Sequence, residues 1–148
     1  MPFAVLGNTA KSSLGDDPVT VFQGDLQWKD ATQLKVGSGL SQWFQANFTK
    51  ATDVYTFKND QQIAIRSNWL FGNQEVYYHF SVSSFNGKLN YRISDLQVMQ
   101  VGDKRSNYRS TEIPVGDFLS NPKNKAMVDQ AGKQLIESLS QTVSLLMN

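Results

Sequence analysis

Between residues 53 and 101 the sequence alternates apolar and polar residues in three successive segments separated by short turn signals. Because side chains two apart in a β-strand point to the same face, this alternation predicts strands with one apolar and one polar face. The apolar positions are Ile63, Ile65, Trp69 and Phe71 in the first segment, Val76, Tyr78, Phe80 and Val82 in the second, and Leu89, Tyr91 and Ile93 in the third. The chain is therefore expected to build a sheet.

Turn residues indicate how these strands are connected. Asn59-Asp60 separates a strand over residues 54–58 from the first segment, and Gly72-Asn73 separates the first segment from the second. Asn86-Gly87 follows the second segment, and Asn-Gly readily supplies the positive φ angles that a tight hairpin turn needs. The sheet is therefore predicted to be antiparallel in this region.

Two further features complete the predicted sheet. The apolar positions of the third segment change parity at Asp95, so that Leu96 and Val98 continue the apolar face, as a β-bulge would require. Residues 19–28 are expected to form an earlier strand, with a shift of face that a second bulge would explain.

Helical patterns flank the strands. Residues 30–33 have the spacing of a capping box and introduce a helix, although Gly37 and Gly39 disfavour its first turns, so the part from Ser38 onward is the firmer prediction. Residues 102–120 are expected to form a long polar loop with a short strand. Asn121 and Pro122 then begin a long terminal helix as N-cap and first residue. Its apolar stripe consists of Val128, Ala131, Leu135, Leu139, Val143 and Leu146, and Ile136 widens it at one edge.

The order of elements predicts the fold class. A chain of 148 residues is long enough for one domain with its own core. We expect a flexible N-terminal lead-in over residues 1–17 and a single α+β domain over residues 18–148. The domain should have two layers, with two helices on one face of an antiparallel sheet of about five strands, in the order β-α-β-β-β-β-α.

Composition excludes several classes of function. The formal charge is only +1 and no basic stripe is present, which disfavours nucleic-acid binding. Zero Cys excludes thiol catalysis and cysteine-bound zinc. No apolar run approaches the ~20 residues of a membrane-spanning helix. The opening residues 1–6 are shorter than the ~7–15-residue apolar core of a signal peptide, and no signal peptide is recognisable there.

Catalytic and metal-binding patterns are not found in the sequence. His79 is the only histidine, so a His-based triad or a His-rich metal site cannot form. The acidic residues lack the spacing of a calcium loop, and the serines lack a nucleophile elbow. Lys104, Arg105 and Arg109 form a small basic loop for which solvent exposure is the simpler explanation. We therefore expect no catalytic residues, no metal and no cofactor, and no enzymatic activity.

The polar face of the predicted sheet is the candidate binding surface. With both helices on the apolar face, no other predicted element covers the polar one, and a binding surface or a plain solvated face would look alike in sequence. Its residues are Arg66, Asn68, Tyr77, His79, Ser81, Ser83, Asn90, Arg92 and Ser94, of which Arg66, Tyr77, His79 and Arg92 are the candidate contact residues. The aromatic residues are otherwise expected mainly in the core.

Three stretches of the chain resemble the DUF4468 family. They are Leu40-Ser41-Gln42-Trp43-Phe44-Gln45-Ala46-Asn47-Phe48, Gly87-Lys88-Leu89-Asn90-Tyr91-Arg92-Ile93-Ser94-Asp95, and the end of the terminal helix from Leu139 to Met147. The likeness covers roughly residues 18 to 147. It implies a TBP-like fold and an extracytoplasmic location in the periplasm, the envelope or outside the cell, since members are mostly secreted or envelope proteins of Bacteroidetes without an assigned function. "TBP-like" describes the order of elements and implies no DNA binding.

Two functions follow as hypotheses. The first is a non-enzymatic, extracytoplasmic binding module whose open sheet face contacts a protein or a glycan. The alternative is a small apolar-ligand carrier, in which the terminal helix closes over the sheet around a helix-grip-like cavity of ~300 Å³ or more. The sequence leaves the partner, the oligomeric state and the cellular role open.

Overall fold

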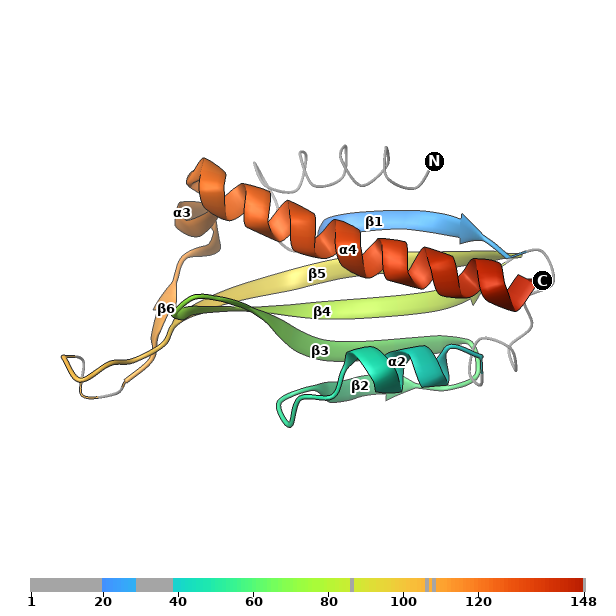
Figure 1. Cartoon of the computed structure of the whole chain (residues 1–148), viewed down its shortest axis with the longest axis horizontal. Helices are drawn as coiled ribbons and strands as arrows, with labels where there is room; N and C mark the ends of the chain where they lie inside the picture. The colour runs from blue at the N-terminus through green and yellow to red at the C-terminus, as the bar shows by residue number, and fades with distance from the viewer. Residues whose placement is uncertain (1–19, 29–38, 86, 106, 108, 148) are drawn as a thin grey trace.

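A computed structural model describes residues 20–28, 39–85, 87–105, 107 and 109–147 (Figure 1). The predicted lead-in over residues 1–17, the capping box at residues 30–33 and Asn86 lie outside these residues. The described elements are β1 (Thr20–Gln27), α2 (Ser41–Asn47), β2 (Val54–Lys58), β3 (Gln62–Phe71), β4 (Gln74–Phe85), β5 (Lys88–Gln100), β6 (Thr111–Ile113), α3 (Val115–Ser120) and α4 (Pro122–Met147).

The strands form one antiparallel sheet in the order β1-β5-β4-β3-β2, and β6 pairs with the end of β5 (Figure 1). Strands β2 to β5 follow one another as a meander, as the turn signals predicted. Asn59 closes the β2–β3 turn, because its Oδ1 accepts hydrogen bonds of 2.8 Å from the backbone N–H groups of Gln61 and Gln62. Gly72 and Gly87 adopt φ angles of 64° and 74°, which an L side chain rarely adopts.

The predicted change of parity in β5 is confirmed. Asp95 has a φ of 57°, and the register between β4 and β5 shifts between Tyr77 and His79. Because of this bulge, Leu96 and Val98 point to the same side as Ile93 and are buried with it. In β1 a register shift between Thr20 and Phe22 likewise confirms the expected irregularity.

The helices α2 and α4 lie over the same face of the sheet, and the core lies between the two layers (Figure 1). Trp43 of α2 donates a 2.9 Å hydrogen bond from Nε1 to Oγ of Ser138 in α4, which joins the two helices. Asn121 opens α4 as predicted, since its Oδ1 accepts from the backbone N–H of Lys123 at 3.0 Å. The two-layer α+β prediction is therefore confirmed. None of the described helices combines the length and the apolar character needed to cross a membrane.

The structure differs from the prediction in the segment before α4. The expected loop over residues 102–120 contains β6, which was anticipated as a short strand, and also the helix α3, which was not. Helix α3 has only six residues, too few for a periodic pattern to be recognised, and it is held by the burial of Phe118 and Leu119. The described residues thus form three helices and six strands where two helices and about five strands were expected.

The apolar stripe of α4 is also centred differently. Val128, Ile136, Leu139 and Val143 are buried, whereas Leu135 is half-buried and Leu146, in the last turn, is exposed. Ile136, which was expected at the edge of the stripe, therefore lies at its centre.

Candidate functional site

The open face is the side of the sheet opposite α2 and α4. The register places the nine predicted polar residues on this one side: Arg66 pairs with His79 and His79 with Ser94, Asn68 pairs with Tyr77, Ser81 with Arg92, and Ser83 with Asn90. The alternation in sequence thus assigned the two faces of the sheet correctly. None of the described helices covers the open face.

Arg66 and Tyr77 form the centre of a polar network on this face. The Arg66 guanidinium lies 5.3 Å from the centroid of the Tyr77 ring, within the range of a cation–π contact. Arg66 Nη2 also donates to Oε1 of Gln97 at 2.8 Å, and Gln97 Nε2 donates to Oε1 of Glu112 at 2.9 Å. The network therefore runs across four strands, from β3 through β4 and β5 to β6.

Glu75 binds the hydroxyl end of Tyr77. The Tyr77 hydroxyl donates to Glu75 Oε2 at 2.6 Å, and Asn68 Nδ2 donates to the same oxygen at 3.3 Å. The hydrogen bond to Glu75 raises the pKa of Tyr77, with burial and the negative charge of Glu75 adding to the effect and Arg66 opposing it. Tyr77 is therefore a neutral donor whose ring is fixed between a cation and a carboxylate.

His79 and Arg92 lie on the same face in different surroundings. His79 Nε2 lies 2.7 Å from Thr56 Oγ1, a contact that reaches over β3 and ties β2 to β4. Arg92 is exposed on β5, five residues along the strand from Gln97, beside Ser81 and Gln23. Of the four candidate contact residues, Arg66 and Tyr77 contact each other. His79 is the cross-strand neighbour of Arg66, but its ring lies within hydrogen-bonding distance of Thr56, and Arg92 lies further away on β5. In the part of the chain that is described, no three His, Asp or Glu side chains gather as metal ligands would.

Sequence reasoning missed the apolar residues of the open face. Leu70 is 63 % exposed and has the same parity as Arg66 and Asn68, so its position in the alternation was a signal that an apolar residue lies on the polar side. Val54 and Phe57 of the edge strand β2 are also exposed and pair with Arg66 and Ala64. Phe57 could not have been assigned to this face, because a bulge between Tyr55 and Phe57 changes the alternation.

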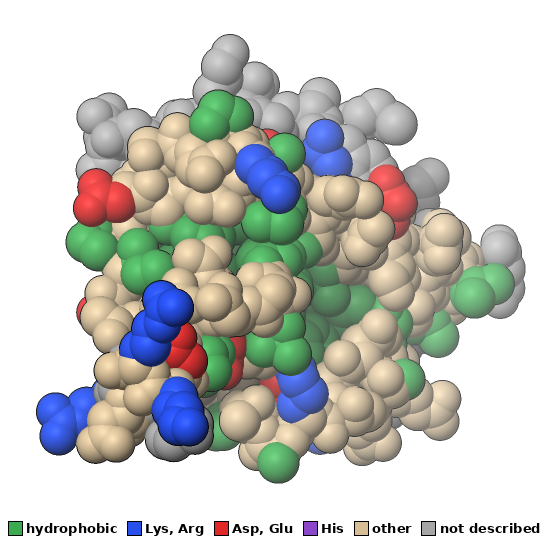
Figure 2. Space-filling view, turned by 60° about the vertical axis from the view of Figure 1, so that its left-hand side comes forward, with side chains coloured by type: hydrophobic (Ala, Val, Ile, Leu, Met, Phe, Trp, Pro, Cys, Tyr) green, Lys and Arg blue, Asp and Glu red, His purple; other side chains and the backbone are tan. Residues whose placement is uncertain are grey.

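A second candidate, here called the helix cleft, lies on the other side of the sheet between α2 and α4. Its volume is about 280 Å³. Figure 2 shows a hollow with hydrophobic atoms at its floor on the side of the molecule where this cleft opens. The lining residues are Asn47, Phe48, Lys50, Ser67, Asn68, Trp69, Tyr78, Ala131, Gln134, Leu135 and Ser138.

Trp69 and Tyr78 form the aromatic wall of the helix cleft. Their rings stack with centroids 4.1 Å apart and an interplanar angle of 26°. Burial raises the pKa of Tyr78 to about 12. Trp69 is only half-buried, although its parity predicted a core position, because it borders the cleft. Trp28 is fully buried in the core.

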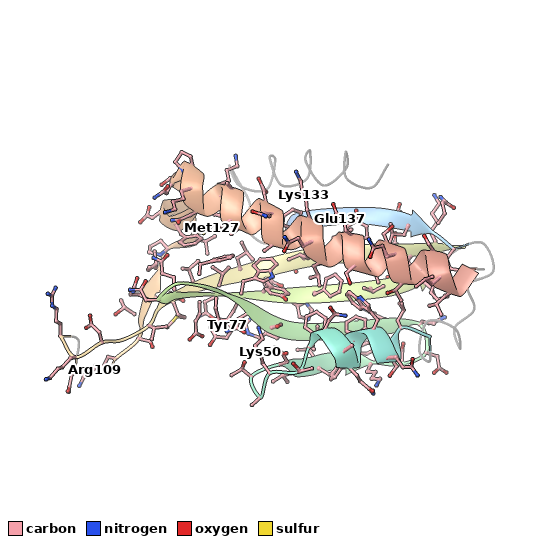
Figure 3. All side chains as sticks on the ribbon, in the orientation of Figure 1. Lys50, Tyr77, Arg109, Met127, Lys133 and Glu137 are labelled. Atoms are coloured by element: carbon pink, nitrogen blue, oxygen red, sulfur yellow. The ribbon has the colours of Figure 1, made fainter. Side chains whose placement is uncertain are left out.

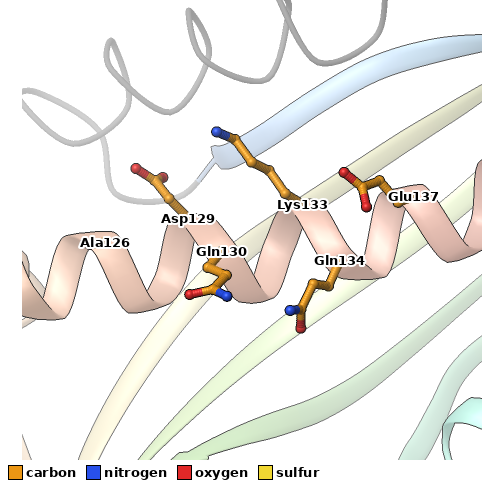
Figure 4. Close-up of a pocket in the computed structure, with 6 residues that line it drawn as sticks. All are labelled: Ala126, Asp129, Gln130, Lys133, Gln134 and Glu137. Atoms are coloured by element: carbon orange, nitrogen blue, oxygen red, sulfur yellow. The ribbon is translucent and has the colours of Figure 1, made fainter.

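A hollow of about 510 Å³ on the outer side of α4 is a weaker candidate. The described residues that line it, Ala126, Asp129, Gln130, Lys133, Gln134 and Glu137, all belong to one helix (Figure 4). Asp129, Lys133 and Glu137 alternate in charge at four-residue steps, a spacing that supports a solvent-exposed helix. The basic loop is also remote from both candidate sites, since Arg109 lies near the far end of the β5–β6 connection (Figure 3).

Comparison with family models and with curated protein sequences gives no match for this chain. Two solved structures have a similar fold. A TBP-like protein from Parabacteroides distasonis superposes with a TM-score of 0.66 at 12 % identity, covering 84 % of this chain and 93 % of that protein. A DUF4468 family protein from Bacteroides ovatus superposes with a TM-score of 0.65 at 9 % identity, covering 90 % of this chain and 94 % of that protein. The resemblance noted in the sequence is thus matched by the fold, which is TBP-like.

Proposed function

We propose that this chain is a non-enzymatic binding module that contacts a partner protein through the open face. The observation that carries the proposal is the Arg66–Tyr77 pair, held at the centre of that face by Glu75 and Gln97. Arg and Tyr concentrate binding energy at protein interfaces, and side chains that are already fixed lose less conformational entropy on binding. A fixed Arg–Tyr pair on a broad sheet face is therefore suited to recognition.

Exposed apolar side chains near this pair favour a protein over a glycan as the partner. Val54, Phe57 and Leu70 are exposed on the same face and lie on the two strands at its β2 edge. Interfaces between proteins combine an apolar, desolvated centre with polar groups around it. The open face offers both kinds of surface on adjacent strands.

The polar groups of the open face support a contact role over catalysis. Glu75 accepts two hydrogen bonds, and His79, the single histidine, is within hydrogen-bonding distance of Thr56. These groups fix one another and do not converge on a position for a reacting atom, which a catalytic site needs. We also propose that the protein acts outside the cytoplasm, which rests on the resemblance to the DUF4468 family.

The state of the core bears on the alternative role as an enclosed apolar-ligand carrier. Ile136, Leu139 and Val143 of α4 pack in one cluster with Phe80 and Ile93 of the sheet, and this part of the layer is filled. The helix cleft lies further toward the start of α4, around Ala131 to Ser138, and has polar as well as apolar walls. A filled core favours the binding module over the enclosed carrier.

Leu70→Asn and Leu145→Asn test the proposal as a matched pair. Both leucines are highly exposed, one on the open face and one on α4, so both variants should melt within a few degrees of the wild type, as surface substitutions do. Tyr77→Ala and Arg92→Ala map how far the contact extends. Each protein is used as bait on an envelope extract and on a glycan array.

We expect Leu70→Asn and Tyr77→Ala to lose a specific protein partner that the wild type and Leu145→Asn retain. If Leu70→Asn keeps the partner, the contact surface lies elsewhere. Binding to the glycan array that depends on Tyr77 would instead identify a glycan as the partner.

A further inference from the structure

The helix cleft is separate from the open face and has a different chemical character. It lies on the helix side of the sheet, where the segment after α2, strands β3 and β4, and the middle of α4 meet. Figure 3 shows Lys50 on the segment between α2 and β2, next to the sheet. The helix cleft has a volume of about 280 Å³, close to the lower limit of about 300 Å³ for small-molecule pockets. A cleft of this size suits a ligand of one or two rings.

The apolar part of the cleft is largely aromatic. The stacked rings of Trp69 and Tyr78 form one wall, with Phe48 beside them, and Leu135 and Ala131 of α4 contribute aliphatic groups. Stacked aromatic rings are rigid and present flat surfaces, which favour a planar ligand over a flexible aliphatic chain.

The charged group at the cleft is a cation. Lys50 is the one charged side chain among the described residues that line it, and its Nζ donates to the backbone carbonyl of Asn68. An ammonium group has three donors, and this contact uses one of them. The nearby carboxylate of Asp53 already accepts from the Ser67 hydroxyl at 2.6 Å and from the Lys50 backbone N–H at 3.0 Å.

Neutral polar groups complete the lining. Asn47 and Gln134 bring amides from α2 and α4, and Ser138 brings a hydroxyl whose oxygen accepts from Trp43. Asn68 borders the cleft through its backbone carbonyl, which accepts from Lys50, whereas its side chain lies on the open face and bonds to Glu75.

We propose that the helix cleft binds a small aromatic carboxylate. The flat ring packs against Trp69 and Leu135, the carboxylate lies at Lys50, and the amides of Asn47 and Gln134 bind polar substituents of the ring. This site is independent of the contact role of the open face, and either one can be absent without the other.

Titration calorimetry and NMR of the labelled full-length chain test the site with two probes of nearly the same shape. Indole-3-acetate carries the carboxylate, and indole-3-acetamide replaces it with a neutral amide. We expect indole-3-acetate to bind with a Kd of about 0.1–1 mM, as for ligands of this size, and the amide to bind about fivefold more weakly. The largest shifts should occur at the Trp69 indole N–H, Lys50 and Asn47.

Two matched pairs of variants locate the ligand. Gln134→Glu adds a negative charge at the rim of the cleft, whereas Gln130→Glu adds the same charge one turn away on the same helix, outside the cleft. Lys50→Met removes the cation, and Lys133→Met removes one from the outer side of α4. We expect Gln134→Glu and Lys50→Met to weaken binding of indole-3-acetate at least about threefold, and the two control variants to leave it unchanged.

The proposal is overturned if neither probe causes shifts around the cleft at millimolar concentration. It is equally overturned if the acid and the amide bind alike and Lys50→Met has no effect, or if the shifts map to Arg66 and Tyr77 on the open face. Gln134 and Gln130 are both exposed, so neither substitution should unfold the protein. A difference in binding between the two variants therefore reports the position of the added charge.

Discussion

Helix α4 lies so close to β1 at Gly132 that a methyl group would not fit there. A Cβ atom built at Gly132 would lie 2.4 to 3.0 Å from three ring carbons of Phe22, which is less than any ordinary contact. Phe22 is 1 % exposed and belongs to the core cluster, so its ring has little room to move away. Gly132→Ala therefore tests this close approach between α4 and the sheet.

Two opposing effects set the magnitude. Ala is favoured over Gly in a helix interior by about 1 kcal/mol, so the substitution would stabilise α4 if space allowed. Overpacking a core costs typically about 1–3 kcal/mol, because neighbouring side chains must leave their preferred rotamers. We expect the packing cost to prevail, with a net loss of about 0–2 kcal/mol in the free energy of unfolding.

Gly116→Ala is the matched control. Gly116 lies in helix α3, and a Cβ there would meet nothing within 4 Å, so the change should stabilise the fold by about 0.4–1 kcal/mol. For a chain of this size each kcal/mol changes Tm by about 2–4 °C, which places Gly132→Ala about 1–12 °C below Gly116→Ala. Thermal melts followed by circular dichroism measure the difference. If Gly132→Ala melts as high as Gly116→Ala, the close packing of α4 on Phe22 is wrong.

Two further predictions concern the core. Leu139 is fully buried, so Leu139→Ala should lower the free energy of unfolding by about 2–5 kcal/mol in a denaturant titration, and a chain ending at Ser120 should not give the wild-type melt. Burial raises the pKa of both Tyr78 and Tyr91 to about 12, with the charge of Asp25 adding to the effect at Tyr91. Because unfolded tyrosines ionise near pH 10, stability should be unaffected by them below pH 10 and should fall between pH 10 and 12, by up to about 1.4 kcal/mol per tyrosine and pH unit. A Tyr78→Phe variant with the same loss of stability over this range would contradict the assignment.

The sheet could be predicted from sequence because the signals that define it lie within each strand and in the short turns between strands. Alternation fixes the face of each residue in a strand, and short turns restrict neighbouring strands to antiparallel pairing. Even the bulge at Asp95 left a signal, since the buried parity passes from Ile93 to Leu96. The two faces, and with them the position of Arg66 and Tyr77, follow from the same pattern.

The missed features depend on contacts between distant parts of the chain. The partners of Arg66 and Tyr77 are Gln97 and Glu75, and the sequence gives no reason to single out these two among many polar residues. Helix α3 is too short for its own periodicity to be visible. The half-burial of Trp69 depends on how far α2 stands from α4, which is a property of the packed layers and of no single segment.

The unequal lengths of β2 and β3 explain why the helix cleft forms where it does. Strand β2 pairs with β3 only from Ile63 to Arg66, whereas β4 pairs with β3 as far as Phe71. Beyond Arg66 no described strand covers the outer edge of β3, and the backbone groups on that edge need other partners. The segment between α2 and β2 supplies two contacts there, from Lys50 to the Asn68 carbonyl and from Asp53 to the Ser67 hydroxyl. The same segment places the Lys50 ammonium group beside the aromatic wall of Trp69 and Tyr78. The candidate ligand site therefore follows from the way this fold protects an uncovered sheet edge.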